Sequence, residues 1–193
     1  MKAVPTEEFL RWAAEKGIRV DEMKLLTMPV PREFARFWVL PHDPTSWPFF
    51  IGILLGGLDN WSTGHLWPRS GRWPEFGKAE SDNEAVRDVV LRGIGVPSSF
   101  SGAMHFDRDE KDALISILFV SLLFGWCVDD DLFFIPDHGC QLMQTDHHDV
   151  IHVECLYEER IQELIAHMAG AGYDLPTELP DGTFKLPVWM GKS

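Results

Sequence analysis

Basic residues are scarce in this sequence: 17 Lys and Arg stand against 30 Asp and Glu, which gives a formal net charge of −13. Nucleic-acid binding requires clustered Lys and Arg that contact phosphates, and docking on an anionic membrane requires the same residues. The shortage argues against both partners. It favours a basic protein, whose approach an acidic surface would steer, although acidic charge that serves only solubility is an alternative.

Cysteine is scarce as well, and the three cysteines, Cys127, Cys140 and Cys155, include no Cys-x-x-Cys pair. This count excludes a disulfide framework or a zinc knuckle, and it predicts buried, reduced thiols. Long apolar runs are missing too: none is long enough to span a bilayer, and the first residues lack the apolar core of a signal peptide. We therefore expect a cytoplasmic location.

Hydrophobic residues make up 45 % of the 193 residues, which is enough for a folded core, and the length fits a single globular domain, 1–193. Helical periodicity and capping residues predict helices at about 6–17, 49–58, 82–93, 108–124 and 157–169. In the third of these, Ser81 and Glu84 form a capping box. Ala85, Val86, Val89 and Val90 form its apolar face.

Between about 126 and 155 the pattern changes to strands separated by turns, which predicts an antiparallel β-meander with strands near 126–128, 132–135, 140–144 and 150–155. Helices packed on a small meander make an α+β fold. Residues 60–77 have no periodicity and predict a long loop, and 94–104 predict turns. Residues 34–40 stay unassigned, and 183–188 are a strand candidate.

A His-rich turn is the first candidate site, because imidazole and carboxylate groups bind divalent transition metals. The candidate ligands are His138, His147, His148, Asp149 and His152. In an extended strand His148 and His152 would lie about 13 Å apart at ~3.3 Å per residue, so a shared metal requires a tight turn at 145–149 that also meets His138. A solvent-exposed polar turn is the alternative.

The triplet Asp146-His147-His148 resembles the namesake motif of the DHH phosphoesterases, which implies manganese binding. The resemblance covers three residues, and the upstream His-x-Asp-x-Asp of that family is missing. A hydrolase that depends on Mn or Zn is therefore one functional hypothesis, and otherwise no cofactor is expected. Nucleophile-elbow, P-loop and dinucleotide-binding motifs are absent, so catalysis is not favoured.

Two further stretches are candidate contact sites. Asp129-Asp130-Asp131 offers carboxylates to a hard cation or a basic partner, or else blunts a sheet edge. The Trp-rich stretch contains Trp67, Arg69, Arg72 and Trp73, and Trp and Arg dominate interface hot spots. One interpretation is that this stretch is the contact surface of a structural or assembly protein. The alternative is that its Trp rings cover the core.

Size, negative charge and a helix–meander–helix unit at 107–169 resemble the small acidic immunity proteins of bacteria, which neutralise a co-produced toxin. The segment CVDDDLFFIPDHGCQLMQTDHHDVIHVEC, residues 127–155, carries the resemblance. It implies a non-catalytic domain that inhibits a basic partner. The acidic residues expected to meet Lys or Arg of that partner are Asp129, Asp130, Asp131, Asp146 and Asp149.

Overall fold

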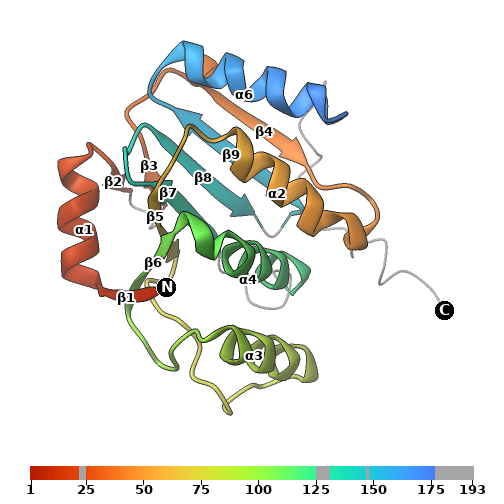
Figure 1. The fold of residues 1–193 in the computed structure, drawn as a ribbon. Coiled ribbons are helices and arrows are strands. Elements are labelled where there is room, and N and C mark those ends of the chain that lie inside the picture. Colours follow the sequence, from red (N-terminus) through yellow and green to blue (C-terminus); the bar gives the residue numbers. More distant parts are fainter. Residues whose placement is uncertain (22–24, 125–130, 147, 177–193) are drawn as a thin grey trace.

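The fold is α+β, with helices packed on an antiparallel sheet, as the sequence predicts. The structure is a computed structural model and describes residues 1–21, 25–124, 131–146 and 148–176. Its main sheet has seven strands in the order β1-β6-β5-β7-β8-β9-β4 (Figure 1). These are β1 (Lys2–Pro5), β4 (Ala35–Val39), β5 (Thr63–Pro68), β6 (Gly102–Asp107), β7 (Leu132–Pro136), β8 (Gln141–Asp146) and β9 (Val150–Cys155). A separate small hairpin pairs β2 (Arg19–Val20) with β3 (Leu26–Thr27).

The helices divide between the two faces of the main sheet. One face is covered by α2 (Trp47–Gly57), α4 (Lys111–Leu123) and α6 (Glu158–Gly170), and the other by α1 (Thr6–Glu15) (Figure 1). Helix α3 (Asp82–Ile94) packs against α4 at the margin of the first layer. Three short 3-10 turns are η1 (Arg32–Phe34), η2 (Pro44–Ser46) and η3 (Arg108–Glu110).

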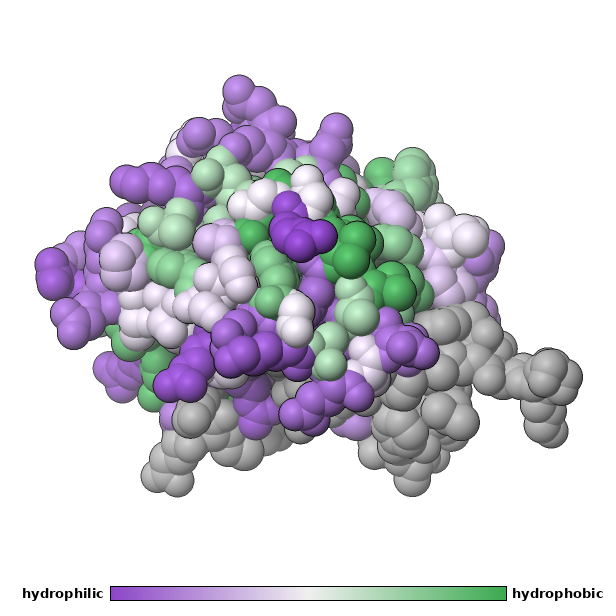
Figure 2. All heavy atoms as spheres, turned by 90° about the horizontal axis from the view of Figure 1, so that it is seen from below, coloured by the Kyte–Doolittle hydropathy of each residue, from purple (hydrophilic) through white to green (hydrophobic). Residues whose placement is uncertain are grey.

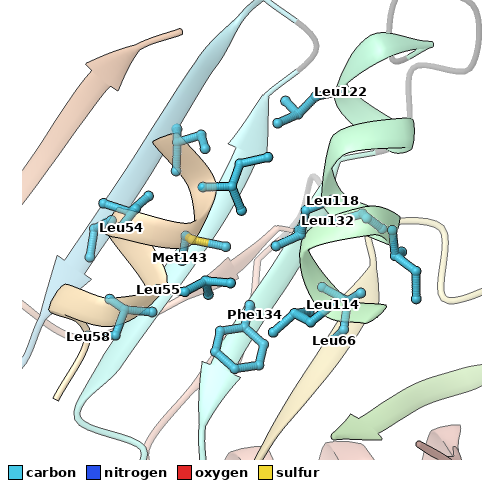
Figure 3. Packing of buried hydrophobic residues seen from close by; sticks show 14 of the residues in the cluster. Leu54, Leu55, Leu58, Leu66, Leu114, Leu118, Leu122, Leu132, Phe134 and Met143 are labelled. Atoms are coloured by element: carbon cyan, nitrogen blue, oxygen red, sulfur yellow. The ribbon is translucent and has the colours of Figure 1, made fainter. Parts of the chain in front are cut away.

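Each face of the sheet buries its own apolar cluster, because successive strand residues point to opposite sides. In β7, Leu132 and Phe134 join the cluster beneath the helices, whereas Phe133 and Ile135 join the cluster beneath α1. Figure 3 shows how leucines from two helices interlock with the sheet in the larger cluster. The contributors include Leu54, Leu55 and Leu58 of α2, Leu114, Leu118 and Leu122 of α4, and Leu66 and Met143 of the sheet.

All five predicted helices are present, with their ends shifted by a few residues. In α3 the Ser81 hydroxyl accepts the Glu84 amide at 3.3 Å, as the capping box requires, while the Glu84 carboxylate bonds the amide of Glu80. Gly95, with φ of 97°, ends α3. Local capping chemistry therefore fixes both ends of α3.

The extent of the sheet was under-predicted. The meander forms β7, β8 and β9, but it is part of a seven-stranded sheet. The expected loop at 60–77 contains β5, the expected turns at 94–104 run into β6, and the unassigned 34–40 contains β4. Strand β1 had no sequence prediction. The strand candidates at 126–128 and 183–188 lie outside the described residues.

Strand β5 cannot be recognised from the sequence alone. Both of its faces are buried, so it has no alternation of polar and apolar residues. It also contains Gly64 and Pro68, which indicate turns. Gly64 is required by packing: a Cβ there would lie 2.6 Å from the ring of Phe134. A glycine that allows close approach was thus mistaken for a loop residue.

Helix α3 is an insertion in the connection between the paired strands β5 and β6. The segments that lead to and from it run beside each other: Trp73 donates its amide to Phe100 O at 2.8 Å, and Arg72 forms a β-bridge with Ser101. The indole of Trp73 also donates to Gly102 O at 3.0 Å. Both ends of the insertion are therefore tied to the end of the β5–β6 pair.

Candidate functional site

Helix α3 exposes two of its valines to solvent, although Val90, Leu91 and Ile94 pack toward the core. Val86 and Val89 are 52 % and 60 % exposed. The protein-facing side holds Arg87, Asp88 and Leu91, which are 8 %, 5 % and 2 % exposed. A surface helix normally buries its apolar residues and exposes its charges, so two exposed valines and a buried ion pair are unusual. The exposed side chains and glycine of this surface, called the α3 face from here on, are Ala85, Val86, Val89 and Gly93.

A groove of about 280 Å³ runs beside the α3 face. Its lining consists of Phe76, Gly77, Ala79, Ala85, Asp88, Val89 and Arg92. Figure 2 views the molecule from the side on which Figure 1 draws α3, and it shows apolar residues gathered there among hydrophilic ones. Single exposed apolar residues are ordinary, but a contiguous patch beside a groove is typical of an interaction site.

The charges around the α3 face are separated along the helix. Glu80 and Asp82 are exposed near its N-terminal end. The base that precedes them, Lys78, is paired with Glu75 at 2.8 Å. Arg92 lies in the last turn of the helix and lines the groove. The surface is therefore negative at the N-terminal end of α3 and positive at its C-terminal end.

Two residues that the sequence assigns to different contact sites, Asp131 and Arg69, lie together. The guanidinium of Arg69 is 3.7 Å from the carboxylate of Asp131, which also accepts the side-chain amide of Gln144 at 3.2 Å. Asp131 is only 4 % exposed, so its carboxylate mainly joins the ends of β5, β7 and β8. Asp129 and Asp130 lie outside the described residues.

The His-rich turn joins β8 to β9. Asp146 accepts the backbone amide of His148 at 2.9 Å and lies 3.7 Å from Nε2 of His152. Asp149 has a positive φ of 61°, and burial raises the pKa of its carboxyl. His138 lies at the other end of β8, roughly 17 Å away along the strand at ~3.3 Å per residue, and contacts the carbonyl of Asp59 at 3.4 Å.

The proposed metal ligands are therefore divided between the two ends of a strand. Across the residues that the structure describes, no group of three or more His, Cys, Asp or Glu side chains is arranged to hold a metal ion. His147, the middle residue of the DHH-like triplet, lies outside them. The hypothesis of a metal site requires His138 to lie beside the His-rich turn, and it does not.

The tryptophans of the predicted contact loop are buried. Trp67 is 6 % exposed and stacks on Phe9 with a centroid distance of 4.6 Å, and Trp73 is 4 % exposed. Both rings cover the core, as the alternative interpretation of this stretch holds. Arg72 is exposed beside them, and its backbone forms the bridge to Ser101.

Two buried groups have strongly shifted pKa values. Burial raises the pKa of the Cys155 thiol to about 11, so it is protonated and unreactive at neutral pH. Burial, aided by nearby His105, lowers the pKa of His65 to about 4. The His65 ring lies 4.2 Å from the ring of Trp12 and stays neutral. The sequence did not single out His65 because β5 was read as a loop.

No protein-family model matches the chain, and comparison with curated proteins and with solved structures finds no match either. In the described part of the chain, no helix is long and apolar enough to cross a membrane. Function is therefore inferred from the physical character of the α3 face. The sequence shows the valine pattern of that face, but the direction in which it points depends on tertiary packing.

Proposed function

We propose that this chain is a non-catalytic binding protein that holds a basic partner protein, as an immunity-type inhibitor does. The observation that carries the proposal is the exposure of Val86 and Val89 on α3 beside the groove. Val86 and Val89 are more than half exposed, while Arg87 and Asp88 form a buried ion pair, and Asp88 lines the same groove as Val89. Exposed valines beside a groove gain free energy when a partner covers them.

The expected gain is modest for each side chain, so the two valines form the apolar centre of a larger interface. Complete burial of a valine contributes about 1.5 kcal/mol or more, so covering the exposed halves of Val86 and Val89 contributes roughly 1 kcal/mol each. An interface combines such an apolar centre with a polar rim. Glu80 and Asp82 supply acidic groups to that rim.

Charge supports a basic protein over other partners. The net charge of −13 repels phosphates and anionic lipid, and it steers a cationic protein toward the surface. A hydrolase has less support because its proposed ligands lie at two ends of β8. Assembly through Trp67 and Trp73 has less support because both rings are buried.

The test is affinity capture from the cells that make the protein, with three immobilised forms. The wild type is compared with Val86→Asp/Val89→Asp and with Val20→Asp, a matched control at a valine that is 47 % exposed in β2. Circular dichroism and melting temperature establish that all three are folded. We expect one basic protein to be retained by the wild type and the control, lost by the double variant, and released by raised salt.

Two results would contradict the proposal. The first is a set of captured proteins that is the same for all three forms. The second is a stoichiometric divalent metal in the purified protein, removed by EDTA together with a hydrolytic activity. That result would restore the enzyme hypothesis.

A further inference from the structure

We infer that the partner presents an amphipathic helix that docks in the groove beside α3, antiparallel to α3, with its basic C-terminal end over Glu80 and Asp82. The inference rests on the proposed function and specifies the kind of segment that the α3 face accepts. It follows from the shape of the groove, the size of its residues and the separation of charge along α3.

The shape of the groove favours a helix. One wall is α3, whose backbone amides and carbonyls bond within the helix, so that wall offers side chains and no strand edge. An extended segment laid there would leave its own amides and carbonyls unpaired against α3, whereas a helix satisfies them internally. Helix-in-groove docking therefore costs less than strand docking at this surface.

The residues of the α3 face allow close approach. Ala85, Val89 and Gly93 recur at intervals of four, and Ala79 lines the groove opposite them. A Cβ at Gly93 would meet no atom within 4 Å, so the space above it is open. Small residues in such a row let a second helix pack at the usual 8–10 Å between axes.

The charge separation sets the direction. Glu80 and Asp82 stand at the N-terminal end of α3, and Arg92 stands at its C-terminal end. Helices favour Lys and Arg near their own C-termini, where these side chains offset the helix dipole. A docked helix that runs antiparallel to α3 places such a basic end over Glu80 and Asp82. The dipoles of the two helices then point in opposite directions, which is favourable.

A second copy of this chain is a less suitable occupant. Antiparallel α3 helices would bring Arg92 near Glu80 of the other copy, but each copy carries a net charge of −13. The α3 face offers four small residues, whereas a stable interface covers roughly 800 Å² on each partner. A separate basic protein can add contacts beyond the docked helix, and its positive charge is attracted to this chain where a second copy would be repelled.

The test uses three sets of synthetic peptides of about 16 residues, slightly longer than the 13 residues of α3. The first set has a Leu/Ala stripe at helical spacing with Lys in the C-terminal half. The second has the same composition with Lys in the N-terminal half, and the third keeps the C-terminal Lys but breaks the spacing. Binding to the full chain is followed by amide chemical shifts and titrated to obtain Kd.

We expect the first set to bind with Kd values in the micromolar range and to shift amides of residues 76–79 and 82–94. The second set should bind at least threefold more weakly, and the third at least tenfold more weakly. The variant Glu80→Lys/Asp82→Lys should reverse the preference between the first two sets. Val86→Asp/Val89→Asp should abolish binding, and Val20→Asp should leave it unchanged.

Several results would overturn the inference. Equal binding by the third set would show charge attraction without helix recognition. Equal binding by the first two peptide sets would show that the position of Lys does not matter, and this would contradict the antiparallel orientation. Concentration-dependent dimerisation that Val86→Asp/Val89→Asp abolishes would make a second copy the occupant. If no peptide shifts α3 while capture of a natural partner still depends on Val86 and Val89, the helix inference fails and the proposed function stands.

Discussion

Arg87 and Asp88, neighbours in the chain, form an ion pair of 2.9 Å on the protein-facing side of α3. The pair lies where a surface helix usually places leucine or valine, and its presence there accompanies the outward position of Val86 and Val89. Removing two charges from water costs free energy that their attraction only partly offsets. We therefore expect the ion pair to contribute little net stability to α3.

The first prediction concerns this ion pair. Asp88→Leu should destabilise the protein by about 3 kcal/mol, because it leaves the charge of Arg87 buried without its partner. Arg87→Met/Asp88→Leu should lose much less, or gain stability, because neither charge remains. Urea unfolding of the two variants and the wild type measures the difference. A double variant as unstable as the single one would show that the pair itself stabilises α3.

The second prediction concerns His65. Its pKa is about 4 in the folded protein against 6.5 for an ordinary histidine, so the unfolded chain binds the proton more readily. The stability contributed by neutral His65 is full above pH 6.5 and falls as the pH drops toward 4, by about 3 kcal/mol in total. His65→Phe should remove this part of the pH dependence. Unfolding free energies between pH 7 and 4 measure it.

The matched control for His65 is the exposed His42. His42→Asn should leave the difference in stability between pH 7 and pH 4 unchanged. If His65→Phe and the wild type lose stability in parallel over this range, the folded protein takes up a proton on His65 without cost, which contradicts the prediction.

The third prediction concerns Asp149, which combines a positive φ of 61° with a carboxyl pKa raised by burial. Asp149→Asn keeps a residue that tolerates this backbone and removes the penalised charge, so stability at pH 7 should rise. The gain should shrink as the pH falls and the wild-type carboxyl takes up a proton. Asp149→Ala should be about 1 kcal/mol less stable than Asp149→Asn, because alanine disfavours this backbone. Thermal unfolding at pH 7 and pH 5 compares the three proteins.

The fourth prediction concerns Gly102, where φ is 141° and a Cβ would lie 2.0 Å from the carbonyl oxygen of Val4. Gly102→Ala should cost about 3 kcal/mol or more, because β1 must move away from β6. Gly93→Ala is the control: its Cβ meets nothing, and alanine favours the helix by about 1 kcal/mol. Equal unfolding midpoints in urea for Gly102→Ala and the wild type would contradict the placement of β1.

The helices were predictable because local chemistry decides them. The Ser81 cap and the apolar spacing of α4 depend on residues a few positions apart, and the structure contains both helices. Strand β5 was not predictable in this way. It pairs with β6 and β7, which come from distant parts of the chain, and the apolar clusters on the two sides of the sheet bury both of its faces, so its sequence lacks the alternation that identifies a half-buried strand.

The candidate site shows the same limit. The spacing of Val86 and Val89 predicts an apolar face, and an apolar face ordinarily points to the core. Only the packing of Arg87, Asp88 and Leu91 against the rest of the molecule reveals that it points outward. The His-rich turn does not converge with His138, because the extended strand β8 lies between them.

The insertion of α3 between β5 and β6 has an evolutionary consequence. Because the bridge between Arg72 and Ser101 fixes both ends of the excursion, the outward residues of α3 can be replaced without a change of register in the sheet. Under the proposed function, related chains would keep the sheet while their α3 surfaces change to suit different partners. Selection for new specificity would accumulate in residues 75–95, much as it does in the variable loops of a constant scaffold.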